Sequence, residues 1–175
     1  MVARRTLLTH VDSAGRARMV DVSGKRISER RARAQAIVTL SAEADAALRA
    51  GTLPKGDALE VVRYAAIQAA KQTACLLPLC HPLRLTGVDA RLERAGRGRW
   101  RVVTRVAAHD RTGVEMEALT AASVGALALY DMVKAIDRSA AVERVVLLEK
   151  SGGRSGRFVR PAADGAPRRA RRPRG

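Results

Sequence analysis

The sequence predicts a single α+β domain. Extended segments are mixed with helices, without the strict alternation of strand and helix that a parallel sheet requires. Two of the extended segments are joined by a short, basic turn that contains glycine, which is typical of an antiparallel hairpin. With 175 residues, the chain is long enough for one domain with a core and too short for two comfortable ones.

The first part of the chain is expected to contain two extended segments and a short helix. Residues 18–26 and 31–41 are read as extended, and the second segment alternates arginine with small or apolar residues. Ser41 should cap the helix, because a serine side chain accepts a hydrogen bond from its first free amides. Gly51 should end it.

A second helix and the hairpin follow. Asp57 and Glu60 have the spacing of a capping box, and the alanine-rich run after them continues as a helix to Thr73. Residues 85–92 and 100–107 are the two strands of the hairpin. The residues expected on one face of its second strand are Trp100, Val102, Thr104 and Val106.

The longest predicted helix runs from about residue 113 to 138. Its core-facing stripe, at the spacing of an amphipathic helix, is Leu119, Ala122, Ala126, Leu129, Val133 and Ile136. A final strand over residues 142–148 leads into KSGGRSG, whose glycines allow backbone N–H groups to approach an anion.

The charge of the chain points to polyanionic partners. A formal net charge of +16 suits nucleic acid, nucleotides or phosphate-bearing metabolites. Binding of nucleic acid is the less favoured interpretation, because some of the arginines lie in the terminal segment PRRARRPRG and not in the folded domain. The chain also has only one Trp, two Tyr and one Phe, which are too few for a surface that stacks on the bases of single strands. We expect residues 161–175 to be a disordered Arg/Pro-rich tail behind a domain of residues 1–160.

The sequence favours a cytoplasmic protein. No apolar run approaches the roughly 20 residues of a membrane span, and no signal-peptide pattern is seen. Cys75 and Cys80 do not form a disulfide framework, and reduced thiols fit that compartment.

Cys80 and His81 lie side by side between Pro78 and Pro82, which is awkward inside a helix or a central strand. A metal site is disfavoured, because no further ligands have workable spacing. Adjacent residues of an extended chain point to opposite faces, so one should pack and the other should face a cleft. A structural histidine and a ligand-binding histidine are equally compatible with the residues.

Several charged residues are candidates for chemistry. Glu115 has the spacing of a capping box with Thr112, which leaves Glu117 as the better site residue. Asp131 and Lys134 are helix neighbours, either a surface ion pair or a proton-transfer pair.

Glu117 and Asp131 are separated by roughly 21 Å of helix, so the ligand is long or a second subunit completes the site. Lys55 lies in a turn before a helix start, where it could bind phosphate or be a solvated loop lysine.

Seven strings in this order resemble one known family: MVDVSGK, LPKGD, IQAAKQT, LPLCHPL, TGVEMEALTAASV, LYDMVKAID and LLEKSGGRSG. The chain is similar to cyclic pyranopterin monophosphate synthase, the molybdenum-cofactor biosynthesis protein C family. The resemblance spans nearly all of residues 8 to 158.

The resemblance implies a ferredoxin-like antiparallel sheet packed on helices and a homohexamer, a trimer of dimers with sites at subunit interfaces. The implied enzyme is a lyase. It converts 3',8-cyclo-7,8-dihydroguanosine 5'-triphosphate, supplied by a radical-SAM partner enzyme, into cyclic pyranopterin monophosphate and pyrophosphate. The sequence itself requires no metal, and we expect no cofactor, although magnesium could accompany the triphosphate.

The resemblance also assigns residues. Asp131 matches the family's active-site aspartate. The residues at its substrate-binding positions are Leu79, Cys80, His81, Met116 and Glu117. Other pocket positions are matched by Lys55, Glu115 and Lys134, and phosphate contacts by Lys71 and Lys150. We expect Lys55, Asp131 and Lys134 to carry the chemistry, with His81 and Glu117 orienting the base.

Two other readings are kept. A basic nucleic-acid-binding module would bind through the tail with a steep dependence on salt. A regulatory domain of ferredoxin-like shape would bind a nucleotide without releasing pyrophosphate.

Overall fold

The computed structural model describes residues 14–161. The predicted domain is therefore described from residue 14 onward, and the tail expected at residues 161–175 lies outside the described residues from residue 162 on. The elements, in chain order, are β1 (Ser28–Thr39), α1 (Ala42–Ala50), α2 (Ala58–Lys71), α3 (Thr73–Leu76), β2 (Leu85–Gly96), β3 (Arg99–Asp110), α4 (Glu115–Val133), β4 (Ala141–Ser151) and β5 (Phe158–Val159).

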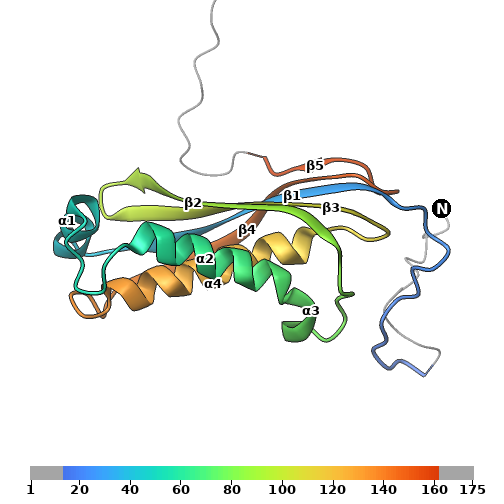
Figure 1. The fold of residues 1–175 in the computed structure, drawn as a ribbon, viewed down its shortest axis with the longest axis horizontal. Coiled ribbons are helices and arrows are strands. Elements are labelled where there is room, and N and C mark those ends of the chain that lie inside the picture. Colours follow the sequence, from blue (N-terminus) through green and yellow to red (C-terminus); the bar gives the residue numbers. More distant parts are fainter. Residues whose placement is uncertain (1–13, 162–175) are drawn as a thin grey trace, which may run out of the picture.

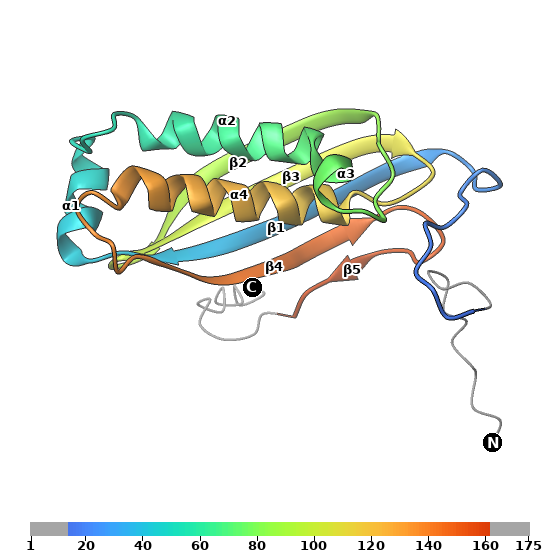
Figure 2. The same ribbon diagram turned by 90° about the horizontal axis from the view of Figure 1, so that it is seen from below.

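The strands form one antiparallel sheet in the order β2-β3-β1-β4-β5. The first four strands have the order of a ferredoxin-like fold. Helices α2, α3 and α4 cover one face of the sheet, while α1 lies beyond one end (Figure 1). Figure 2 shows α2 and α4 side by side across that face. The predicted fold class is confirmed.

The sheet buries the face that the sequence predicts. Val102, Thr104 and Val106 of β3 are almost inaccessible, and Trp100 is nearly so. The hydroxyl of Thr104 donates to the carbonyl oxygen of Ala118 at 2.8 Å, which ties the sheet to α4. A buried hydroxyl needs such a partner, so this bond also fixes the position of the helix.

Helix boundaries follow from local caps. Ser41 accepts a hydrogen bond from the Ala44 amide, and Gly51 takes the left-handed conformation at the end of α1, as predicted. Asp57 caps α2 by accepting from the amides of Leu59 and Glu60. The capping box is only half formed, because the Glu60 carboxylate binds Arg63 at 2.7 Å instead.

Helix α4 is shorter than predicted, and its start is different. The buried residues Ala122, Ala126, Leu129 and Val133 confirm most of the predicted stripe, although Ile136 lies beyond the helix. The N-cap is Val114, which makes no side-chain capping bond, so the capping box proposed for Thr112 and Glu115 is wrong.

Residues 18–26 do not form a strand, which corrects the expectation for this segment. The Ser23 amide donates to the Asp21 carboxylate at 2.8 Å, and the Lys25 amide donates to the Val22 carbonyl oxygen at 3.0 Å. An aspartate that binds the backbone two residues on favours a turn over a strand.

Helix α4 is long and apolar enough to cross a membrane by length and composition. It packs on the sheet and beside α2 (Figure 2), as the core helix of a globular domain does. The close approach depends on small residues: a Cβ added to Gly125 would lie 2.9 Å from a methyl group of Val102 and 3.4 Å from Ala66.

We expect Gly125→Val to lower the free energy of unfolding by about 1 to 3 kcal/mol, because the larger side chain overpacks this contact. Urea denaturation measures the change. The matched control is Gly87→Ala, since a Cβ at Gly87 meets no atom within 4 Å. Equal stability of the two variants would contradict the close packing.

Candidate functional site

A cavity of about 520 Å³ lies at the start of α4. Three segments contribute most of its lining: the loop before β1, the turn after α3 and the first residues of α4. We call it the α4 cavity. Six of the predicted site residues line it: Leu79, Cys80, His81, Glu115, Met116 and Glu117.

Cys80 and His81 both line the α4 cavity, so the expectation that one packs while the other faces a cleft is wrong. That expectation assumed extended backbone, but the Cys80 amide donates to the Leu77 carbonyl oxygen at 3.0 Å and closes a turn. Burial, and then the Glu117 carboxylate, raise the pKa of the Cys80 thiol. A protonated thiol is a poor nucleophile, so Cys80 is suited to contact a ligand rather than attack it.

Glu117 is a buried carboxyl group that lines this cavity. It is 4% exposed and forms no ion pair within the part of the chain that the structure describes. Burial, and to a smaller extent the neighbouring Glu115, together raise the pKa of Glu117 to about 7, although a backbone hydrogen bond acts in the opposite direction. A carboxyl group with a pKa near neutrality can accept or donate a proton at working pH.

A second cavity, of about 820 Å³, adjoins the first. Lys25, Arg154 and Glu115 line both. We call it the basic cavity, and the basic residues that line it are Lys25, Arg26, Arg30, Arg111, Lys150 and Arg154. Glu115 is its single acidic lining residue among residues 14–161. This charge excess suits a phosphate-bearing ligand.

Arg30 holds the wall of the basic cavity together. Its guanidinium donates to the carbonyl oxygens of Asp110 and Arg111, at 3.2 and 3.1 Å. Gly153 has a φ of +73°, which favours glycine, and a Cβ added there would meet the Arg30 guanidinium. The loops after β3 and β4 therefore meet on one buried side chain.

The residues predicted to carry the chemistry form an ion cluster at the other end of α4. Asp131 accepts from Nζ of Lys55 at 2.6 Å and from Nζ of Lys134 at 2.7 Å. The hydrogen bond from Lys134, and then that from Lys55, lower the pKa of Asp131 to about 2. The carboxylate also raises the pKa of Lys134. Asp131 and Lys134 are therefore charged at neutral pH.

The ion cluster and the α4 cavity lie at opposite ends of α4. The 14 residues between Glu117 and Asp131 correspond to roughly 21 Å of helix. One chain therefore holds two separate groups of predicted site residues. Lys71, at the end of α2, is exposed and lines neither cavity.

The model of the MoaC family matches residues 19–153, which is most of the chain. The chain belongs to the MoaC family. This is the family of cyclic pyranopterin monophosphate synthases, which acts in molybdenum cofactor biosynthesis. The matched range includes every predicted site residue, while Arg154 of the two cavities lies one residue beyond it.

Sequence reasoning missed part of the basic cavity of this MoaC chain. Arg26, Arg30 and Arg111 were not singled out, since arginine is common throughout the sequence. Arg154 lies in the glycine-rich KSGGRSG, which was noted as an anion-binding segment. This segment was therefore the feature of the sequence that could have indicated the basic cavity.

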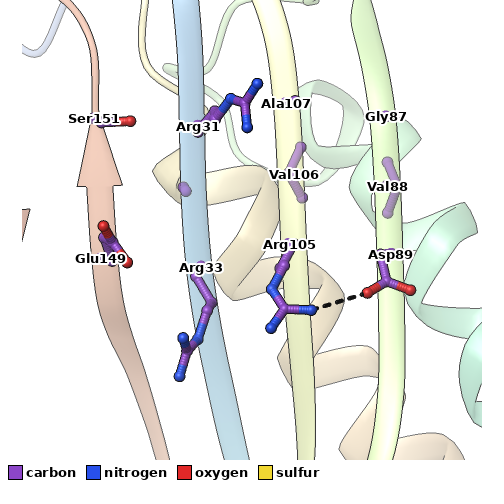
Figure 3. A pocket seen from close by; sticks show the side chains of 11 residues that line it. Arg31, Arg33, Gly87, Val88, Asp89, Arg105, Val106, Ala107, Glu149 and Ser151 are labelled. Atoms are coloured by element: carbon purple, nitrogen blue, oxygen red, sulfur yellow. Dashed lines mark hydrogen bonds and ion pairs between the residues drawn. The ribbon is translucent and has the colours of Figure 1, made fainter.

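A third cavity, of about 490 Å³, lies on the sheet face away from the helices. Figure 3 shows Arg31 and Arg33 of β1 beside Arg105 of β3, with Arg105 paired to Asp89 at 3.3 Å. Nε of Arg33 is buried and finds no hydrogen-bond acceptor among the described residues. None of the predicted site residues lies here.

We expect Glu117→Gln to remove a pH-dependent loss of stability. The pKa of Glu117 is raised on folding, so its protonated form favours the folded state, and stability falls as pH rises from about 4.5 to 7. This loss is at most about 3.4 kcal/mol, at 1.36 kcal/mol per pKa unit.

Urea denaturation at pH 5 and pH 8 measures it, with the exposed Glu43→Gln as control. The parent and Glu43→Gln should lose more stability between the two pH values than Glu117→Gln. An equal loss in all three proteins would contradict the raised pKa.

Proposed function

We propose that this MoaC chain converts 3',8-cyclo-7,8-dihydroguanosine 5'-triphosphate into cyclic pyranopterin monophosphate and pyrophosphate, as a lyase. The observation that carries the proposal is the joining of the two cavities. The α4 cavity offers apolar side chains and one proton-exchanging carboxyl group, while the basic cavity offers six basic residues. A ligand with a purine-derived ring at one end and a triphosphate at the other fits this pair.

The residues of the two cavities would bind different parts of the substrate. Leu79, Met116 and His81 would hold the ring system, with Cys80 as a further contact. Lys150 and its basic neighbours would bind the phosphates and stabilise the departing pyrophosphate. Lys71, exposed at the end of α2, remains a proposed phosphate contact.

In the step that releases pyrophosphate, the α-phosphorus separates from the oxygen that bridges it to the β-phosphorus. That oxygen leaves with the pyrophosphate. A hydroxyl oxygen of the substrate then bonds that phosphorus and closes the cyclic phosphate. The proton lost by the hydroxyl needs an acceptor. Glu117, with a pKa near 7, is a proton-transfer group in this scheme, which extends the orienting role first expected for it.

Asp131 would act as an ionised group that holds two ammonium groups in place. With a pKa of about 2 it is a weak base at neutral pH, whereas Lys55 and Lys134 bring positive charge to the developing negative charge. Since the cluster is remote from the α4 cavity of its own chain, we propose that a second copy completes each site. A homohexamer, as a trimer of dimers, provides such copies.

The remaining elements of the proposal concern the setting. A radical-SAM enzyme would supply the substrate, and the protein would act in the cytoplasm. We propose no resident cofactor; magnesium could enter with the triphosphate, whose oxygens are ligands that it prefers.

The first test supplies purified protein with enzymatically made cyclised GTP and measures pyrophosphate release and pterin formation. We expect turnover by the parent and its loss in Asp131→Ala, because the two lysines then lose their shared anchor. Asp131 is half exposed, so this variant should fold and assemble like the parent. Binding without turnover by the parent would favour the regulatory-domain reading.

We also expect Arg154→Ala to raise KM about 10-fold or more, since hydrogen bonds to charged groups contribute about 1.5 to 3 kcal/mol. Arg154 lines both cavities and makes no hydrogen bond or ion pair to another residue in the part of the chain that the structure describes. Arg31→Ala, on the opposite sheet face, is the control. Equal KM values for the two variants would argue against phosphate binding in the basic cavity.

The nucleic-acid-binding reading is tested by deleting residues 161–175. Binding of DNA that disappears with the tail and with added salt, while turnover persists, would be incidental electrostatics.

A further inference from the structure

The third cavity lies on the open face of the sheet, where two neighbouring rows of side chains cross the strands. One row is charged and contains, across β2, β3, β1 and β4, Asp89, Arg105, Arg33 and Glu149. The next row has small residues on three of these strands, namely Gly87, Ala107 and Ser151. Small side chains beside long ones leave a hollow, and its volume is about 490 Å³. We call it the sheet-face cavity.

Two arginines of the charged row face each other. Arg33 of β1 is paired in register with Arg105 of β3, and Figure 3 shows the two side chains on these neighbouring strands. Residues directly opposite in an antiparallel pair have Cβ atoms about 4.5 to 5.5 Å apart, and like charges at such positions destabilise the sheet. An anion bound between the two guanidinium groups would remove this repulsion.

Arg33 makes no ion pair and no side-chain hydrogen bond within residues 14–161. Its Nε atom is buried and finds no acceptor there. A buried donor without a partner is uncommon in folded proteins. The carboxylate on its other side, that of Glu149, pairs with Arg157 instead, at 2.7 Å. Arg33 is therefore a cation for which the described part of the chain supplies no counter-charge.

The second arginine of the pair has only a share of a carboxylate. Oδ2 of Asp89 accepts from Arg105 at 3.3 Å and also from Arg91 at 3.1 Å. By contrast, Arg31, which lines the same cavity, pairs with Glu29 at 2.6 Å. The charged row therefore keeps an excess of positive charge among the described residues, and this excess lies in its middle.

We propose that the sheet-face cavity binds a phosphate-class oxyanion between Arg33 and Arg105. A guanidinium group presents its N–H donors in a planar fork that matches two oxygens of a phosphate group, and Nε is one of these donors. The volume lies in the range of small-ligand sites, so it admits free pyrophosphate or the phosphates of a nucleotide.

This site differs from the basic cavity. The two cavities share the lining residue Ser151 and none of their basic residues. Binding of an anion at the sheet face is also independent of the reaction proposed above, because it involves none of the residues assigned to that reaction.

Thermal unfolding of the full chain tests the site, with inorganic pyrophosphate as the probe. A ligand that binds only the folded state raises the Tm, and a concentration about five times the Kd should raise it by roughly 2 to 4 °C for a chain of this size. Arg33→Gln should lose this part of the response. Sodium chloride at the same ionic strength corrects for general screening of charge.

The same variant should behave differently when no pyrophosphate is present. Removing one of two opposed cations relieves their repulsion, so Arg33→Gln should unfold at the same temperature as the parent or at a higher one. A folded variant that does not respond to pyrophosphate then reports loss of binding. Arg33→Lys keeps the charge without the planar fork and should retain only part of the response.

Two further variants locate the binding. Arg144 of β4 is exposed and lines none of the three cavities, so Arg144→Gln should respond to pyrophosphate like the parent. Arg154→Ala changes the basic cavity and should keep the part of the response that depends on Arg33. An equal response in Arg33→Gln and Arg144→Gln overturns the site. A parent that gains nothing beyond the salt control overturns it too, as does a response that Arg154→Ala abolishes completely.

A comparison of probes identifies the source of the phosphate group. Inorganic phosphate, pyrophosphate and GTP are tested at equal concentration, and the part of each response that Arg33→Gln removes is compared. A larger value for pyrophosphate than for GTP assigns a free anion, and the reverse assigns the phosphates of a nucleotide.

Crystals of the parent soaked with tungstate, a heavy analogue of phosphate, provide a measurement that needs no variant. Anomalous density between Arg33 and Arg105 supports the site. Density that is confined to the basic cavity overturns it.

Discussion

The length of α4 is the constraint on which the rest of the site depends. A helix rises 1.5 Å per residue, so residues that share one helix cannot meet if many residues separate them. Packing against the sheet and α2, through contacts as close as that of Gly125 with Val102, holds this helix along its length. The chain therefore presents two chemically different ends at a fixed separation, and any shared chemistry requires a second molecule or a long ligand.

The same constraint explains why two carboxyl groups on one helix behave differently. Glu117 faces a cavity and loses water without pairing to a cation from residues 14–161, which raises its pKa to about 7. Asp131 stays half exposed between two lysines, which lower its pKa to about 2. Both side chains carry a carboxyl group, but that of Glu117 is buried while that of Asp131 is half exposed beside two lysines. Separate environments of this kind let one protein hold a proton-exchanging group and a permanently charged group at neutral pH.

Much of the fold could be predicted, because its signals are local. Ser41 and Gly51 end α1 through their own side chain and backbone, and the period-two burial from Trp100 to Val106 follows from strand geometry. Predictions from the sequence failed where the same local pattern was compatible with more than one backbone structure. The segment around Asp21 could form a strand or a turn, and the capping spacing at Glu115 was not used.

The site was predictable as a set of residues and not as an arrangement. Sequence strings identified the family and the predicted residues of the α4 cavity and of the ion cluster, because a motif preserves the order and type of side chains. They did not identify Arg26, Arg30 and Arg111 of the basic cavity. Only the tertiary structure decided that Cys80 and His81 face one cavity, that Lys55 reaches Asp131, and that arginines from three loops form a basic wall. Those contacts join residues far apart in the chain, and their geometry depends on how strands and helices pack, which no local pattern encodes.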